Sequence, residues 1–317
     1  MNTWMIPIHE ESDIPSVTGV SGTSERAVAL GFFDGVHRGH QCIFSVMMKR
    51  AEERKLKTGV QTFATPPSSK RQSPMLTTYK EKCEIIEKTG VDDILALPFN
   101  DAIQNMHAEQ FLTVCVARWM RARVIVVGED YRFGANREGN IDMLKAWGAR
   151  NGIEIIAVPA EKYRGRVISS TWIRECVKDG NIELAHLLLG RPMTYHGIVE
   201  QGHHLGRTLG FPTANIRIGE EKTIPRFGVY ASRYTFNGTV YPSITNIGMR
   251  PTVNRDDCTP IIETMLYGVD SELYGTNGTV ELLAYVRPER VFPDVQGLKA
   301  QVDHDKEEVW HYHNTKK

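Results

Sequence analysis

Residues 26–40 read RAVALGFFDGVHRGH, and this stretch decides the fold of the first half of the chain. The apolar run 26–33 predicts a buried β-strand, and residues 41–57 predict a helix with one apolar face. A glycine-rich turn joins the two. In an open parallel sheet, ligands bind at the carboxyl ends of the strands, and a helix N-terminus attracts phosphate. The turn is therefore the first candidate site.

Two histidines in this turn carry its predicted chemistry. His37 and His40 are spaced so that both can point into one phosphate site, where they would donate hydrogen bonds. Such donors stabilise the charge that builds on an α-phosphate as pyrophosphate leaves. Glycines let the backbone approach an anion closely. The other candidate nucleotide-binding residues here are Gly31, Phe33, Asp34 and Gly39. The alternative is a glycine-rich turn with two solvated histidines.

Strand-like and helix-like segments alternate through the rest of the first half. Further strands are predicted at 59–63, 94–99, 124–128 and 153–159. Helices are predicted at 79–89, 108–120 and 141–149. This alternation predicts an α/β domain with a mostly parallel sheet and helices on both faces.

Two more clusters in the first half are candidates for substrate binding. At the end of the strand 124–128, Asp130 could contact a substrate hydroxyl or ring nitrogen and Phe133 could stack on a ring; turn chemistry and core packing are the alternatives. Residues 168–174, ISSTWIR, suit the start of a helix that carries an arginine one turn in. Together with the histidines they are the expected anchor for the β- and γ-phosphates of ATP, and alone they would be a simple helix cap. The candidates in this cluster are Ser169, Ser170, Thr171 and Arg174.

The pattern changes near residues 190–192, GRP, after which antiparallel strands are predicted. Asn-Gly dipeptides at 237–238 and 277–278 favour type I′ hairpin turns. One amphipathic helix follows, with Val295, Leu298, Val302 and Val309 on a shared face. The second half is therefore predicted to be a small β-barrel with a C-terminal helix.

The second half contains its own phosphate loop and candidate metal ligands. The glycine-rich stretch 202–215 is suited to a polyphosphate, and its candidate residues are Gly206, Arg207 and Gly210. Thr213 and Asn215 lie two positions apart on an extended segment, so their side chains are predicted to lie on the same face. A hydroxyl and an amide oxygen suit a Mg²⁺ that keeps most of its waters. Glu263, among apolar neighbours, is a candidate general base for an attacking alcohol, or else an exposed residue of an edge strand.

Composition limits the class of protein. The 317 residues are about twice the roughly 150 expected for one domain. Lysine plus arginine and aspartate plus glutamate both number 38, so the net charge is zero, which argues against a nucleic-acid-binding protein. The five cysteines include no CxxC pair, which favours buried reduced thiols. The N-terminus does not resemble a signal peptide and no apolar run would span a membrane, so a cytoplasmic protein is expected.

With both halves analysed, the chain resembles the prokaryotic bifunctional riboflavin kinase/FMN adenylyltransferases, also called FAD synthetases. The first half resembles them in GFFDGVHRGH, VVGEDYRFG and ISSTWIR, and the second in GRTLGFPTANI, TNIGMRPTV and LKAQVDHD. The resemblance implies a Rossmann-like nucleotidyltransferase domain at 1–186, which transfers AMP from ATP to FMN. It implies a six-stranded antiparallel riboflavin kinase barrel with a C-terminal helix at 187–317.

The resemblance also implies roles for the candidate residues. His37 and His40 would hold the ATP phosphates, and the 169–174 cluster would complete the pyrophosphate cradle. Thr213 and Asn215 would position Mg²⁺ and ATP, and Glu263 would activate the ribityl 5′-hydroxyl. The expected ligands are riboflavin, FMN and ATP, with FMN and FAD as products. Neither nucleic acid nor membrane is expected as a partner, and a weak homo-oligomer is left open.

The chain departs from the family pattern at two places. Family members carry Phe-(Asp/Glu)-Pro-His-Pro after the second strand, where this chain has FATPP at 63–67 and lacks the acid and the histidine. One expected contact to ATP or flavin is therefore missing. After Glu263, Met265 stands where histidine is usual, and residues 268–269 are Gly-Val where Asp-Phe is usual.

Other functions fit fewer of these features. A monofunctional adenylyltransferase would leave the second half without a role, and a relative of the class I aminoacyl-tRNA synthetases is disfavoured by the zero net charge and short length. An enzyme with only one active half, or a flavin-binding regulator that has lost turnover, remains an alternative.

Overall fold

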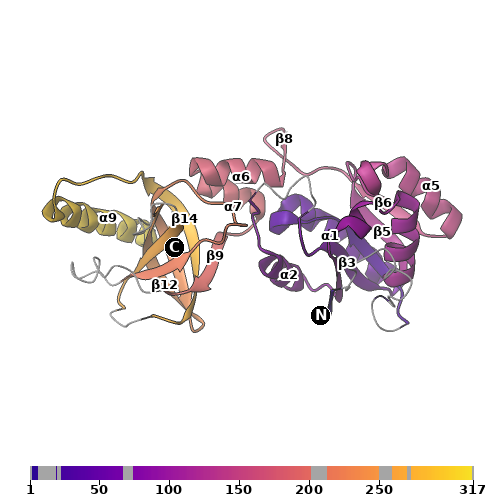
Figure 1. Ribbon diagram of the computed structural model, residues 1–317, viewed down its shortest axis with the longest axis horizontal. Coiled ribbons are helices and arrows are strands. Elements are labelled where there is room, and N and C mark those ends of the chain that lie inside the picture. The colour runs from indigo at the N-terminus through magenta and orange to yellow at the C-terminus, as the bar shows by residue number, and fades with distance from the viewer. Residues whose placement is uncertain are drawn as a thin grey trace. The chain divides into compact units, whose positions relative to one another are not determined.

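A computed structural model describes residues 2–5, 19, 23–66, 74–200, 213–249, 259–269 and 273–315. The chain forms two compact units, Met1–Ser170 and Thr171–Lys317 (Figure 1).

The first unit is built on a six-stranded sheet in which every pairing is parallel. Its strands, in spatial order, are β1 (Asn2–Met5), β4 (Asp93–Leu97), β3 (Lys57–Phe63), β2 (Arg26–Leu30), β5 (Ala122–Gly128) and β6 (Glu154–Val158). The main helices are α1 (Arg38–Arg54), α2 (Tyr79–Glu87), α3 (Asp101–Gln104), α4 (Ala108–Gln110), the π-helix η4 (Phe111–Trp119) and α5 (Ile141–Asn151). A short hairpin, β7 (Lys162–Tyr163) and β8 (Arg166–Val167), follows β6. The predicted parallel α/β architecture is confirmed.

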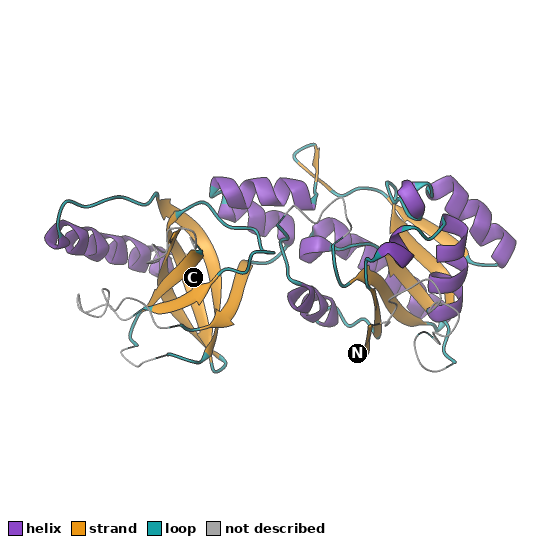
Figure 2. Cartoon of the chain, viewed as in Figure 1, coloured by secondary structure: helices purple, strands orange, loops and turns teal. Residues whose placement is uncertain are grey.

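Both faces of this sheet are buried, and Figure 2 shows helices on the two sides of it. Val28 and Leu30 of β2 belong to one apolar cluster, which includes residues of η4 and α5. Ala27 and Ala29 of the same strand belong to the other cluster, which α1 covers. Successive side chains of a strand point to opposite faces, so a doubly covered sheet requires continuous apolar strands. This requirement explains the uninterrupted apolar run in β2.

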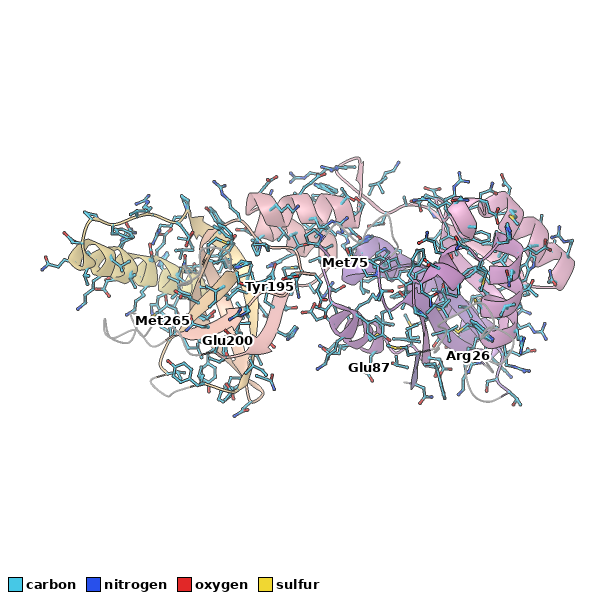
Figure 3. The ribbon with its side chains drawn as sticks, viewed as in Figure 1. Arg26, Met75, Glu87, Tyr195, Glu200 and Met265 are labelled. Carbon is cyan, nitrogen blue, oxygen red and sulfur yellow. The ribbon has the colours of Figure 1, made fainter. Side chains whose placement is uncertain are left out.

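The second unit is an antiparallel sheet in the order β10-β13-β12-β11-β14-β9. The strands are β9 (Met193–Ile198), β10 (Ala214–Arg217), β11 (Gly228–Phe236), β12 (Thr239–Met249), β13 (Pro260–Leu266) and β14 (Asn277–Arg287). An isolated bridge between Glu200 and Asn215 joins the two ends of the sheet, so the barrel is nearly closed (Glu200 is labelled in Figure 3). The predicted six-stranded antiparallel barrel is confirmed.

The described part of this unit includes the helices α7 (Ile182–Leu189) and α9 (Val295–Thr315), and all of α6 (Ser170–Asp179) except its first residue. The helix α7 packs on β9 and β14, and the compact units divide at 170/171, before the predicted boundary. The functional boundary at 186/187 stays a prediction. The predicted C-terminal helix is confirmed, and its Val309 is fully buried against the barrel beside Met265. Val295, predicted on the same face, is 56% exposed, so this residue does not contribute to the packing of α9.

The two Asn-Gly predictions have different outcomes. Asn237 (φ 47°) and Gly238 (φ 76°) both have the positive φ of a type I′ turn between β11 and β12. The prediction for 277–278 is wrong, because both residues lie inside β14 and pair with β9. Gly278 is needed there for packing, since a Cβ would collide with the hydroxyl of Tyr234.

Within the described part of the chain, no helix is long and apolar enough to cross a membrane. The four cysteines that it includes are free thiols, two buried and two half-buried.

Candidate active sites

The turn between β2 and α1 has a strained backbone. Phe33 lies at φ 56° and Val36 at φ 42°, with Gly35 between them at φ 76°. Left-handed φ values are strained for residues other than glycine, and most of all for a β-branched residue such as Val36. Such strain persists only where the surrounding structure holds the backbone, and it clusters at active sites. The turn therefore marks a candidate site at the carboxyl edge of the sheet.

This turn brings the two predicted histidines together at the start of α1. His37 is the N-cap residue of α1 and is only 5% exposed. Its ring stacks on that of His40, with centroids 3.6 Å apart and planes at 21°. Gly39 allows the close approach of helix and ring, because a Cβ there would lie 3.2 Å from atoms of His37. The helix dipole places positive potential at the same point, so the arrangement suits a phosphate group.

Gly31 and Phe33 support the histidines through packing. The Phe33 ring is 2% exposed and meets the His40 ring edge-on at 5.2 Å. A Cβ at Gly31 would lie 2.7 Å from the Phe33 ring, so glycine is required there. Direct contact between the Phe33 side chain and a nucleotide is not supported, because its ring lies inside the protein.

Asp34 ties the turn to the segment that precedes α2. Its side chain is buried, and Oδ1 accepts hydrogen bonds from the N–H groups of Leu76 (2.9 Å) and Thr77 (3.3 Å). In return, the Thr77 hydroxyl accepts a hydrogen bond from the N–H of Gly35 at 3.0 Å. The Asp34 carboxylate is thus engaged within the protein. Sequence analysis missed Thr77, because nothing local relates it to a residue 42 positions earlier.

The Ser-Ser-Thr cluster also meets this turn. Ser170 is the first residue of α6, and its hydroxyl donates to the carbonyl oxygen of Asp34 at 2.9 Å. Ser169 precedes it in the first unit. Thr171 and Arg174 belong to the second unit, where the Arg174 guanidinium donates to the Thr171 hydroxyl at 3.3 Å. Their predicted contact with ATP phosphates stays a prediction.

The two candidates after β5 differ in their surroundings. Asp130 is exposed at the carboxyl end of β5. Its Oδ1 atom lies close to Gly128, since a Cβ added at Gly128 would be 3.1 Å from that oxygen. The ring of Phe133 is 6% exposed and packs between Tyr131 and Phe111 in the apolar core, as its core-packing alternative expects. Its predicted stacking on a substrate ring stays a prediction.

The segment that departs from the family pattern is held by other contacts. The Thr65 hydroxyl accepts a hydrogen bond from the N–H of Phe99 (2.8 Å), and the Phe63 ring meets the Phe99 ring edge-on. The ammonium group of Lys82, on α2, is buried and donates to the carbonyl oxygens of Phe32 (3.0 Å) and Phe63 (2.8 Å). These bonds join the carboxyl ends of β2 and β3 beside the histidine turn.

A thiol on α1 does not add a nucleophile to this site. Burial raises the pKa of Cys42, and the nearby Glu161 carboxylate raises it further. The thiol therefore stays protonated at neutral pH and is a poor nucleophile.

The second candidate site lies on adjacent strands of the barrel. Glu263 on β13 is paired with Asn215 on β10 and with Asn246 on β12, so the three side chains share one face. Glu263 is exposed, as a base that must reach a substrate should be. Asn215 is 2% exposed, and its Nδ2 group makes a long contact of 3.5 Å with the carbonyl oxygen of Thr213.

The environment of Asn215 fits a metal ligand. Its Oδ1 is buried, and no described residue donates a hydrogen bond to it. A buried amide oxygen without a donor is costly unless something else satisfies it. Amide and hydroxyl oxygens, such as those of Asn215 and Thr213, are ligands that Mg²⁺ accepts. The donor set therefore fits the expected ion.

Two further residues at this site were not identified from the sequence. Asn246 donates from Nδ2 to the Glu289 carboxylate at 3.3 Å. Glu289 reaches this position because residue 248 is glycine; a Cβ there would collide with the carboxylate. Asn246 and Glu289 therefore add two polar side chains to the site, beside Glu263. Gly206, Arg207 and Gly210, the predicted phosphate loop, lie outside the described residues.

Comparison with known proteins matches each half to a different family. Residues 21–172 match the family described as FAD synthetase, and residues 189–313 match the family described as riboflavin kinase. A solved Streptococcus pneumoniae protein, described as a macrolide-efflux protein, is similar with a TM-score of 0.83 and 30% identity, over 96% of this chain and 97% of that one.

Curated relatives match most of the chain, across both of its halves. The bifunctional riboflavin kinase/FMN adenylyltransferase of Buchnera aphidicola subsp. Schizaphis graminum is 35% identical over 92% of this chain and 95% of its own. Those of Bacillus subtilis and Escherichia coli are 32% and 34% identical, over 91% and 88% of this chain and 93% and 90% of theirs. With both family matches on one chain and relatives that cover nearly all of it, this chain belongs to the bifunctional riboflavin kinase/FMN adenylyltransferases.

Proposed function

We propose that this protein phosphorylates riboflavin to FMN with ATP and then transfers AMP from a second ATP to FMN, which yields FAD and pyrophosphate. The observation that carries the proposal is that relatives named for both activities cover at least 88% of the chain, across both of its sites. The kinase step belongs to residues 187–317 and the adenylyl-transfer step to residues 1–186.

In the kinase step, the ribityl 5′-oxygen attacks the γ-phosphorus of ATP, and Glu263 accepts the proton of this hydroxyl. The P–O bond to the β-phosphate breaks, and ADP leaves. The exposure of Glu263 and its position beside Asn215 support this role. Phosphoryl transfer needs mainly positioning and charge stabilisation, so Gly206, Arg207 and Gly210 are assigned to the polyphosphate.

Asn215 and Thr213 would hold Mg²⁺, which when bound neutralises charge on the phosphates. The buried and unsatisfied Oδ1 of Asn215 supports this assignment. Asn215 and Thr213 would thereby hold the polyphosphate close to Glu263.

In the adenylyl-transfer step, a phosphate oxygen of FMN attacks the α-phosphorus of ATP, and the bond to the β-phosphate breaks. His37 and His40, at the N-terminus of α1, donate hydrogen bonds to the phosphates as pyrophosphate leaves. The cradle is completed by Ser169, Ser170, Thr171 and Arg174. Asp130 contacts FMN or adenine, whereas Phe33, Asp34 and Phe133 shape the protein around the site, and Gly31 and Gly39 allow the close approaches.

The reactions are expected in the cytoplasm, where ATP is available. No nucleic acid is expected to take part, because the net charge is zero. A weak homo-oligomer stays a prediction that sedimentation would test.

The test is to incubate the full-length protein with riboflavin, ATP and Mg²⁺ and to separate the flavins by chromatography. FMN should form first and FAD after it, and FMN supplied directly should give FAD and pyrophosphate. FMN without FAD would mean that only the kinase half is active. The absence of the family's acid and histidine at 63–67 would be consistent with that result. Retention of flavin without any product would support a binding protein instead.

A further inference from the structure

Three segments from different parts of the first unit hold the strained turn that carries the histidines. Hydrogen bonds reach it from Thr77, from Ser170 and from Gln41, whose side chain donates to the carbonyl oxygen of Val36 at 2.9 Å. Asp34 accepts two more bonds from the segment before α2. A left-handed backbone at Phe33, Gly35 and Val36 can persist only with such support.

Thr77 bonds the turn in both directions: it accepts a hydrogen bond from the turn and donates one to it. It is 8% exposed, and its hydroxyl is an acceptor for the N–H of Gly35, the glycine inside the left-handed stretch. Its own N–H donates back to Asp34 of the same turn. The residue that follows, Thr78, begins α2 with a capping box to Glu81, which fixes the segment from which Thr77 acts. Met75, two residues earlier, is buried as well (labelled in Figure 3).

We propose that Thr77 is a positioning residue for adenylyl transfer: its hydroxyl holds Gly35 in the conformation that presents His37 and His40 to the phosphates. This inference rests on the proposed function of the first unit. Without the hydroxyl, the buried N–H of Gly35 loses its acceptor. A buried donor without an acceptor costs free energy, so a conformation in which this N–H meets another acceptor is favoured. The turn then relaxes, and the histidine pair at the start of α1 loses the position that matters for the transition state.

The test compares Thr77→Val, which keeps the shape and removes the acceptor, with Thr77→Ser, which keeps the hydroxyl. We expect Thr77→Val to lower kcat for FAD formation from FMN roughly 10- to 100-fold, the range of losses for one buried group left unpaired. KM for ATP should change little, and Thr77→Ser should behave as wild type. Riboflavin phosphorylation, measured on the same samples, should be unchanged because it belongs to the other unit.

Thr58→Val is the matched control. Thr58 is also 8% exposed, and its hydroxyl exchanges hydrogen bonds with Asp92 at the opposite, amino-terminal edge of the same sheet. It should lose stability to urea as Thr77→Val does, yet keep its kcat for FAD formation. Equal losses of kcat in Thr58→Val and Thr77→Val, or wild-type kcat in Thr77→Val, would overturn the proposal.

If Thr77→Val does not fold, Thr77→Cys takes its place, because a thiol is a weaker acceptor of nearly the same shape. A kcat for Thr77→Cys equal to that of Thr77→Ser would then overturn the proposal. Wild-type protein that makes no FAD at all refutes the proposed function, and the inference with it. Wild-type protein that makes FAD beside an unaffected Thr77→Val refutes the inference alone.

Discussion

Acidification should destabilise the barrel unit through one partly buried histidine. His186 lies in the last turn of α7, which packs on β9 and β14. Its Nε2 atom is buried, and no described residue accepts or donates a hydrogen bond there. Burial lowers the pKa of His186 from 6.5 to about 4, although a hydrogen bond with the backbone of Leu282 acts in the opposite direction. The folded protein therefore keeps this imidazole neutral over a range in which the unfolded chain protonates it.

The sign and size of the effect follow from this difference. Because the unfolded state binds the proton more tightly, stability is complete above pH 6.5 and falls as pH drops toward about 4. The interval of about 2.5 pH units corresponds to about 3 kcal/mol of unfolding free energy, of which about 2 kcal/mol should be lost by pH 5. Below about pH 4 this histidine contributes no further loss.

The measurement is urea unfolding of the full chain from pH 7 to 4.5, followed by hydrogen exchange in β11 and β14 so that the barrel is observed separately. His186→Gln should remove about 2 kcal/mol of the pH dependence between pH 7 and 5. His304→Gln, which changes an exposed histidine of α9, should leave it intact. A pH dependence in His186→Gln as steep as in wild type would refute the reasoning.

Three further predictions concern the two reactions. Replacing His37 or His40 by Ala should lower FAD formation by about 10²–10³-fold, the usual loss for one transition-state donor, with FMN formation unchanged; equal loss of both activities would contradict the assignment. Glu263→Gln keeps the shape and loses the base, so steady-state FMN formation should fall roughly 10²–10⁴-fold while FAD formation from supplied FMN persists; near-normal FMN production would remove Glu263 from the mechanism. Asn215→Leu should raise the Mg²⁺ concentration needed for half-maximal FMN formation, because it removes a buried oxygen ligand; an unchanged Mg²⁺ titration would exclude Asn215 as a ligand.

The elements that sequence analysis predicted well are those with strong local signals. The buried strand β2, the helix α1 after it and the hairpin at Asn237-Gly238 each follow from a pattern within a short window. The strand β1 was missed, because four residues are too few for a pattern and its identity depends on pairing with β4, about 90 positions away. The second Asn-Gly turn was wrong for a related reason: Gly278 is there to make room for Tyr234 on another strand.

The candidate sites divide in the same way. His37 and His40, like Thr213 and Asn215, could be named as candidates from the sequence, because each pair lies within a few residues and its members suit one predicted chemical purpose. Their geometry depends on residues that the sequence does not relate to them. Thr77 supports the histidine turn from 42 positions away, and Asn246 and Glu289 come from two separate strands or their ends.

The two-part organisation and the alternation of the first half could be predicted from sequence patterns, since hydrophobic period and turn residues act over short distances. Only the folded chain shows that Phe133 packs in the core, that Asp34 accepts hydrogen bonds from the segment before α2, and that Asn215 is paired with Glu263 on the neighbouring strand. Each of these outcomes depends on which distant backbone and side-chain groups meet. Burial and hydrogen-bond satisfaction select those contacts for the chain as a whole, so no local pattern records them.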